Sequence, residues 1–227
     1  FKTGSSYSSP FVAGIASLIR AQFPEYTAPE IAEILRMTAD DVYDKDGNKD
    51  YVNLLGNGRV NAYRALTEIA SIKSVRAKNI THTGREGDLF LRGDTLNISA
   101  NFVNYFQSLS PTASVKLISL SEYATVIEDV FTIGELSSGD TAKNASNPFK
   151  VVLSESLPEY QNLYFKLEFS DTDYEDFQYF FWEADKYFDY HKGNWGFSLD
   201  DNGRVGYIGD DHPYFGIGLK WKQNQLI

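Results

Sequence analysis

The sequence predicts a mixed fold in which a helical first part is followed by an all-β antiparallel sandwich. Apolar residues recur with a helical period up to about residue 70, and they alternate with polar residues beyond that point. Most of the 16 Phe and 15 Tyr residues follow residue 100, and aromatic residues favour strands. We therefore expect three parts, formed by residues 1–72, 73–182 and 183–227.

Three helices are predicted in residues 1–72. The run 8–23 (SSPFVAGIASLIRAQF) is apolar almost all round and rich in small residues, which predicts a buried helix that Pro24 ends. Residues 27–30 (TAPE) form a capping box that opens the second helix. The apolar face of this second helix consists of Ile31, Ile34, Leu35 and Met37. The third helix follows Asn61 and runs through residues 62–69.

The second part reads as short strands without intervening helices, which predicts a sandwich. The strands expected from alternation are residues 95–103, 114–119, 149–153 and 162–169. In the last of these (NLYFKLEF) the apolar side chains all point one way, as in a half-buried antiparallel strand. Residues 201–203 (DNG) predict a hairpin turn, so residues 183–227 begin a further β module or add strands to the sandwich.

Charge and composition exclude several classes of function. The net charge of −10 repels nucleic acid and anionic membranes, so neither is an expected partner. The chain has no cysteine, which excludes disulfides, zinc–cysteine sites and a thiol nucleophile. It also lacks an apolar run long enough for a membrane span.

The residues that indicate chemistry are 4–14 (GSSYSSPFVAG), where a serine stands at the start of a predicted helix. The N–H groups and dipole of a helix N-terminus favour the negative charge that an oxyanion intermediate carries. The small residues after Ser6 allow the helix to pack deeply, which would fix the position of that serine. A serine alone is a poor nucleophile and needs a histidine base with an orienting carboxylate.

This string resembles the signature around the catalytic serine of subtilisin-like serine proteases (subtilases, peptidase family S8). The resemblance implies that Ser6 is the nucleophile of a serine endopeptidase. Residues 56–62 (GNGRVNA) are similar to the turn that closes the family's domain. Residues 35–39 (LRMTA) are similar to the family's L..TA segment, which precedes that turn. Residues 1–72 are therefore expected to be the helical C-terminal remnant of an α/β subtilisin-like domain, and the resemblance covers about the first 70 residues.

The string departs from the family's pattern at three positions. Ser5 stands where the family usually has Thr, Tyr7 where it has Met, and Phe11 where His is common. None of these changes removes a catalytic group, although Tyr7 would reshape the wall of the adjoining pocket. Together they suggest a distant subfamily, of the type of the secreted enzymes of Bacteroidetes.

The other members of the triad are expected outside this chain. In subtilisin-type enzymes the order along the chain is Asp, His, Ser, so both partners of Ser6 would lie upstream. The histidines of this chain, His82, His191 and His212, all lie in the β-rich part. We expect a bacterial enzyme, secreted or at the cell surface, that acts on proteins or peptides. The fragment alone would be inactive, and the upstream part of the same protease domain is a candidate partner.

Weaker patterns leave alternatives open. Residues 44–50 (DKDGNKD) read as a solvated turn, with a Ca²⁺ loop as the less favoured interpretation. The acidic cluster of Asp171, Asp173, Glu175 and Asp176 reads as a hairpin turn, with a surface Ca²⁺ site as the less favoured interpretation. No cofactor is otherwise expected. Core packing is the default for Trp182, Trp195 and Trp221, although they could form a platform for glycans. The alternative function is therefore a non-catalytic β-sandwich module that binds protein or glycan.

Overall fold

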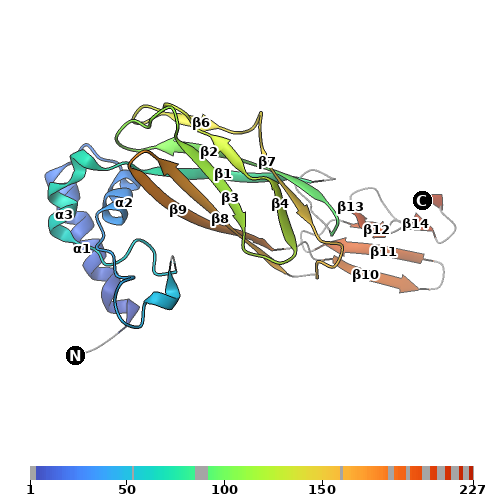
Figure 1. The fold of residues 1–227 in the computed structure, drawn as a ribbon. Coiled ribbons are helices and arrows are strands. Elements are labelled where there is room, and N and C mark those ends of the chain that lie inside the picture. The colour runs from blue at the N-terminus through green and yellow to red at the C-terminus, as the bar shows by residue number, and fades with distance from the viewer. Residues whose placement is uncertain are drawn as a thin grey trace.

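The computed structural model describes residues 4–52, 54–84, 92–158, 161–183, 187–192, 195–200, 205–208, 213–215, 220–221 and 225–226. Helices gather at one end of the molecule and antiparallel sheets form the rest (Figure 1). This arrangement agrees with the mixed fold expected from the sequence. The predicted turn at residues 201–203 and His212 lie outside the described residues.

The first part, which we call the helical segment (residues 4–72), has three α-helices among the residues that the structure describes. They are α1 (Ser5–Gln22), α2 (Ala28–Met37) and α3 (Ala62–Thr67), with 3-10 turns η1 (Lys49–Tyr51) and η2 (Ile69–Ser71). The predicted capping box is confirmed, because Thr27 accepts a hydrogen bond from the Glu30 N–H and the Glu30 carboxylate accepts one from the Thr27 N–H. The third helix ends earlier than predicted, since Ile69 lies in η2 rather than in α3.

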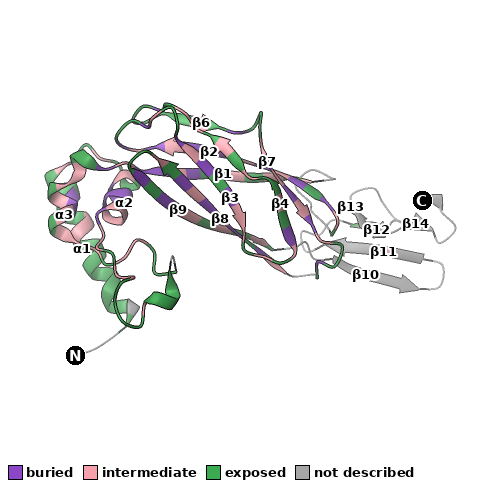
Figure 2. Cartoon of the chain, in the orientation of Figure 1, coloured by how far each residue is buried: buried purple, intermediate pink, exposed green. Residues whose placement is uncertain are grey.

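The prediction that α1 is a buried helix is wrong. The helix forms, but most of its residues up to Gly14 are exposed, and Ile19 is the residue that is fully buried (Figure 2). Ile19 packs in a small core with Ile31 and Ile34 of α2 and Ala65 of α3. The reason is geometric: α2 and α3 are much shorter than α1 and cover only its C-terminal part.

The second part, which we call the two-sheet region (residues 73–183), has nine strands in two antiparallel sheets within its described residues. One sheet has the order β1-β2-β7-β4, with β6 also paired to β2, and the other has the order β5-β3-β8-β9. The strands of the first sheet are β1 (Val75–Thr83), β2 (Thr95–Asn104), β4 (Ala124–Glu128), β6 (Thr141–Lys143) and β7 (Phe149–Leu153). Those of the second sheet are β3 (Ser114–Ser119), β5 (Val130–Thr132), β8 (Asn162–Asp171) and β9 (Tyr174–Glu183).

The two sheets share one hydrophobic core. Inward-facing residues of both sheets, among them Phe102 and Phe149 from the first and Phe165 and Phe169 from the second, form a single buried cluster. Burial alternates along the strands (Figure 2). The predicted strands in residues 95–103, 114–119, 149–153 and 162–169 are confirmed within two residues.

The last strands form a third antiparallel sheet at the end of the molecule opposite the helices (Figure 1). They are β10 (Tyr187–Lys192), β11 (Trp195–Asp200), β12 (Val205–Ile208), β13 (Pro213–Phe215), β14 (Lys220–Trp221) and β15 (Gln225–Leu226). Among the described residues these strands pair only with one another. Trp195 and Trp221 occupy paired positions on β11 and β14.

Candidate functional site

Ser6 lies in the first turn of α1 and is exposed. The turn begins at Gly4, which has a positive φ of 150° and whose carbonyl accepts a 3.0 Å hydrogen bond from the Tyr7 N–H. The first N–H groups of a helix have no acceptor within the helix, so the N–H groups of this first turn are suited to bind an anion. This is the local arrangement that the sequence predicts for a nucleophile.

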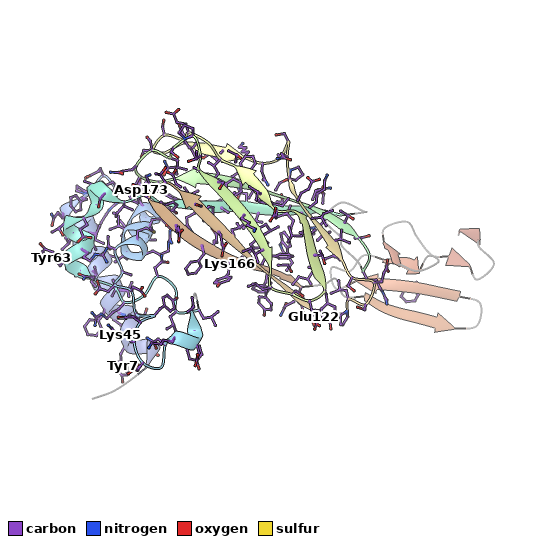
Figure 3. All side chains as sticks on the ribbon, in the orientation of Figure 1. Tyr7, Lys45, Tyr63, Glu122, Lys166 and Asp173 are labelled. Carbon is purple, nitrogen blue, oxygen red and sulfur yellow. The ribbon has the colours of Figure 1, made fainter. Side chains whose placement is uncertain are left out.

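The helix around Ser6 has two further features. Pro10 lies four residues after Ser6 and has no N–H, so it cannot donate the helical hydrogen bond to the Ser6 carbonyl. The helix also exposes apolar side chains, because Tyr7 is 48%, Phe11 73% and Leu18 55% exposed. In Figure 3, Tyr7 lies near the N-terminal end of α1, away from the two-sheet region. Ser6 thus stands at the exposed N-terminal end of an apolar helix.

The turn formed by residues 56–61 (GNGRVN) is fixed by Asp40. The backbone N–H of Asp40 donates to the Arg59 carbonyl at 2.7 Å, and the Arg59 N–H donates back to the Asp40 carbonyl at 2.9 Å. Gly58 has a φ of 112°, and a Cβ atom there would lie 2.0 Å from the Asp40 carbonyl oxygen. The glycine is therefore required both by the backbone conformation and by this close approach.

The side chain of Asp40 adds a second set of contacts to the same turn. Its carboxylate accepts hydrogen bonds from Asn61 at 2.9 Å and from Arg59 at 3.1 Å, and it pairs with Arg64 at 3.6 Å. The hydrogen bond from Asn61, followed by that from Arg59, lowers the pKa of Asp40 below its usual value. Asn61 also caps α3, because its side chain accepts from the Arg64 N–H at 3.1 Å.

The described histidines lie far along the chain from Ser6, in the sheets. His82 is on β1, where its ring packs against Trp182 with 4.5 Å between the centroids, and His191 is on β10. Trp182 also contacts Phe165 and Phe180, so core packing is confirmed for this tryptophan. The side chains of Trp195 and Trp221 lie outside the described residues.

Neither acidic stretch forms a metal-binding cluster in the structure. Within the described ranges no three His, Asp or Glu side chains come together closely enough to hold a metal ion. Asp44 and Asp46 are exposed, and they pair with Lys45 and Lys49. Residues 171–174 form the predicted hairpin turn between β8 and β9, whose last and first residues, Asp171 and Tyr174, are paired.

Sequence reasoning missed the role of two carboxylates at this hairpin. The side chains of Asp171 and Asp176 are fully buried, and they pair with Lys73 and with Arg36 of α2. Burial alone would lower the pKa of Arg36, but the hydrogen bond and charge of Asp176, with those of Glu33, outweigh burial and raise it. Arg36 is therefore held as a cation. The signal in the sequence was a Glu33–Arg36 pair on a helix whose neighbouring positions are apolar.

Comparison with protein families finds a match in the first part of the chain. Residues 1–58 match the model described as "Subtilase family" (Peptidase_S8). The matched range contains Ser6 and its helix and ends inside the turn that Asp40 fixes. The resemblance of the N-terminal segment to subtilases is thus confirmed at the level of the family.

Three curated proteins illustrate the similarity. The chain is 41% identical over 71 residues to subtilisin-like protease SBT1.2 of Arabidopsis thaliana, covering 28% of this chain and 9% of that protein. It is 38% identical to mycosin-4 and 34% identical to mycosin-3 of Mycobacterium tuberculosis, over 65 residues, covering 29% of this chain and 13% of each mycosin. The chain therefore spans only a small share of the length of these relatives.

A likeness to a solved structure is too weak to carry an argument about fold. The structure is a CsuC–CsuE chaperone–tip adhesion subunit pre-assembly complex from the Csu pili of Acinetobacter baumannii. Sequence identity is 9% and the TM-score is 0.22, with 52% of this chain and 80% of that chain covered. As for membranes, the described helices include none with the length and apolar character needed to cross one.

Proposed function

We propose that this chain is the nucleophile-bearing part of a secreted, bacterial subtilisin-like serine endopeptidase, and that Ser6 is its catalytic serine. The observation that carries the proposal is the placement of Ser6 in the first turn of an exposed helix, inside the segment that matches subtilases. Residues 1–72 are then the end of the peptidase domain, and residues 73–182 are an accessory β-sandwich.

The proposed chemistry is acyl transfer to Ser6. The hydroxyl of Ser6 attacks the scissile carbonyl of a peptide while a histidine accepts its proton and an aspartate orients that histidine. The N–H of Ser6, which has no helical acceptor, donates to the oxyanion that forms. The histidine, the aspartate and a second oxyanion donor come from a polypeptide upstream of this chain.

The exposed apolar side chains of the helical segment support such a partner. Tyr7, Phe11 and Leu18 follow a helical spacing along α1 and are 48%, 73% and 55% exposed, and an exposed apolar helix face of this kind favours an interaction site. A polypeptide that covers α1 would also exclude water from Ser6, which strengthens every electrostatic contact in the site. The partner that completes the triad and the partner that covers the helix would be the same chain.

The test uses a fluorophosphonate probe, which labels only activated serines. We expect no labelling of residues 1–227 alone, and labelling after co-expression with the polypeptide encoded directly upstream of Phe1. Ser6→Ala should abolish labelling and casein hydrolysis, whereas Ser9→Ala, on the same exposed helix, should retain both. Labelling of the isolated chain at Ser6 would refute the need for a partner. Labelling of the complex that persists in Ser6→Ala would refute the nucleophile.

A second candidate function is supported by the outer face of β8 and β9. Tyr164 and Phe181 are 47% and 58% exposed, and their rings pair at 5.5 Å across the two strands. Phe177 and Tyr179 form another ring pair at 5.5 Å on the same face of β9. Beside them lies an open hollow of about 450 Å³, lined partly by Lys166, Glu168 and Phe177. Lys166 is labelled in Figure 3.

We propose that this face binds a neutral ligand, a glycan chain. The cation of Lys166 is already paired with Glu168 at 2.7 Å, so the face offers aromatic stacking rather than a free charge. Screening residues 1–227 on a glycan array should detect binding that Tyr164→Ala with Phe181→Ala weakens at least tenfold. Tyr63→Ala, which removes an exposed ring from α3, should leave it unchanged. Binding to peptides instead would replace the glycan proposal, and no binding would refute it.

A further inference from the structure

Helix α2 turns two charged side chains toward the two-sheet region rather than toward solvent. Glu33 and Arg36 lie one helical turn apart and form an ion pair. Arg36 then reaches beyond the helix, and its Nη1 atom donates to the Asp176 carboxylate of β9 at 2.6 Å. This contact joins residues 140 positions apart in the chain.

The two-sheet region meets this pair with charges of its own. Arg76 of β1 approaches Glu33 at 3.7 Å and Asp176 at 3.9 Å. Ser74, just before β1, donates to Glu33 at 2.6 Å. We call these five residues, Glu33, Arg36, Ser74, Arg76 and Asp176, the junction cluster. It contains two cations and two carboxylates, so its formal charges balance.

The junction cluster is largely removed from water. The Asp176 side chain has no exposed surface, and those of Glu33, Arg36 and Arg76 are 11%, 18% and 21% exposed. Buried ions are tolerated only where partners replace water in defined positions, so the arrangement is geometrically demanding. Removing one partner leaves an uncompensated charge, which is far more costly than removing an exposed pair.

Further hydrogen bonds hold Asp176 in place from the side of the sheets. The hydroxyl of Tyr174 donates to Asp176 at 2.9 Å and accepts from the Val75 N–H at 2.9 Å. The Gln178 side chain exchanges two 3.0 Å hydrogen bonds with the backbone of Ala77. Strands β1 and β9 are edge strands of different sheets. These hydrogen bonds therefore hold the two edges together at the place where α2 contacts them.

Arg36 also contacts the turn between α2 and α3. Its Nη1 atom donates to the Asn57 side chain at 3.2 Å, in the turn that Asp40 holds by its backbone. A single guanidinium therefore contacts the helix, the turn and strand β9. By this route the two-sheet region can influence the fold of residues 28–61.

We propose that the edge formed by β1 and β9 is an internal binding surface for helix α2, and that Asp176 is the residue that holds it. The two-sheet region then has a defined role: it keeps the helical segment folded and oriented. This role does not depend on whether Ser6 is catalytic. The partner of the surface is the charged face of α2, recognised through Glu33 and Arg36.

The test compares Asp176→Asn with Asp173→Asn in residues 1–227. Asp173 lies on the same hairpin, where the two-sheet region meets the helices (Figure 3), but its side chain is 70% exposed. The rate of backbone amide hydrogen exchange, read by mass spectrometry, should rise at least tenfold for residues 28–37 in Asp176→Asn. The rate in residues 162–171 should not change, except at the end of that strand next to the hairpin. Asp173→Asn should leave both peptides as in the unmodified chain.

A second variant keeps the test decisive if Asp176→Asn fails to fold. Glu33→Gln removes the carboxylate that α2 contributes to the junction cluster, and it changes no residue of a strand. It should show the same local rise in the hydrogen-exchange rate of residues 28–37. All three tryptophans lie beyond residue 180, so fluorescence follows the β-rich part while circular dichroism at 222 nm follows the helices. On heating Glu33→Gln, the circular dichroism signal of the helices should be lost at a lower temperature than the tryptophan fluorescence signal of the β-rich part. Coincident melting with unchanged exchange in residues 28–37 would overturn the proposal.

Discussion

The helical segment and the two-sheet region differ in how far each covers its own apolar side chains. In the described two-sheet region, one cluster of 21 buried residues takes side chains from both sheets. In the helical segment the corresponding cluster has six members, and one of them, Phe106, comes from the two-sheet region. Meanwhile Phe11, Leu18 and Leu54 stay more than half exposed. The buried core of the two-sheet region thus consists of its own residues, whereas that of the helical segment is completed by a residue from outside it.

The largest effect that separates the two regions is expected from removing a phenylalanine ring. Phe102 is fully buried and its ring contacts those of Phe131, Phe149 and Phe169. Phe102→Ala should lower the free energy of unfolding by about 4 kcal/mol, because a large cavity replaces the ring. Phe11→Ala removes an exposed ring and should change it by less than about 0.5 kcal/mol. Urea unfolding measures both losses, followed by tryptophan fluorescence for Phe102→Ala and by circular dichroism at 222 nm for Phe11→Ala. Equal losses would contradict the comparison.

A smaller loss is expected within the helical segment, at the turn that Asp40 fixes. Gly58→Ala places a methyl group against the Asp40 carbonyl at a backbone conformation unfavourable to alanine, which should cost about 3 kcal/mol. Gly47→Ala is the matched control, since Gly47 also has a positive φ, of 86°, but has open space around it. The control should cost about 1 kcal/mol from backbone strain alone. Thermal unfolding followed at 222 nm distinguishes the two, and equal shifts would show that the close approach is relieved elsewhere.

The sequence predicts local features of both regions well, because these depend on neighbouring residues. The capping box at Thr27 and Glu30 needs only residues three apart, and it forms as expected. The strand 162–169 needs only its own alternation, and Leu163, Phe165 and the other inward residues are buried. The placement of Ser6 at a helix start follows in the same way from the string around it.

Features that depend on distant contacts could not be predicted. The composition of α1 favours burial, but burial is decided by which surfaces pack against the helix, and α2 and α3 are too short to cover it. In the same way, Asp171 and Asp176 read as turn residues in the sequence. Their partners, Lys73 and Arg36, lie about 100 and 140 positions away, and no local pattern links residues at such distances.

The smallest of the expected effects depends on pH and tests a buried ion pair within the two-sheet region, where Asp171 pairs with Lys73 at the start of that region. Asp171 has a fully buried side chain that accepts hydrogen bonds from Lys73 at 3.0 Å and from the Ser110 N–H at 3.1 Å. Burial alone would raise the pKa of Asp171, but the hydrogen bonds from Ser110 and Lys73 outweigh it and lower the pKa well below its usual value. The carboxylate therefore stabilises the fold when it is ionised.

The sign of the pH dependence follows from this lowered pKa. The stabilisation is fully present above the unfolded value, near pH 4, and is lost as the pH falls toward the folded value. Asp171→Asn should cost about 1.5 kcal/mol at pH 7, and the difference from the unmodified chain should shrink between about pH 5 and pH 3. Asp173→Asn, with its 70% exposed side chain, should show a smaller cost at pH 7. A cost of Asp171→Asn that stays constant on acidification would mean that the packing of the side chain, rather than its charge, stabilises the two-sheet region there.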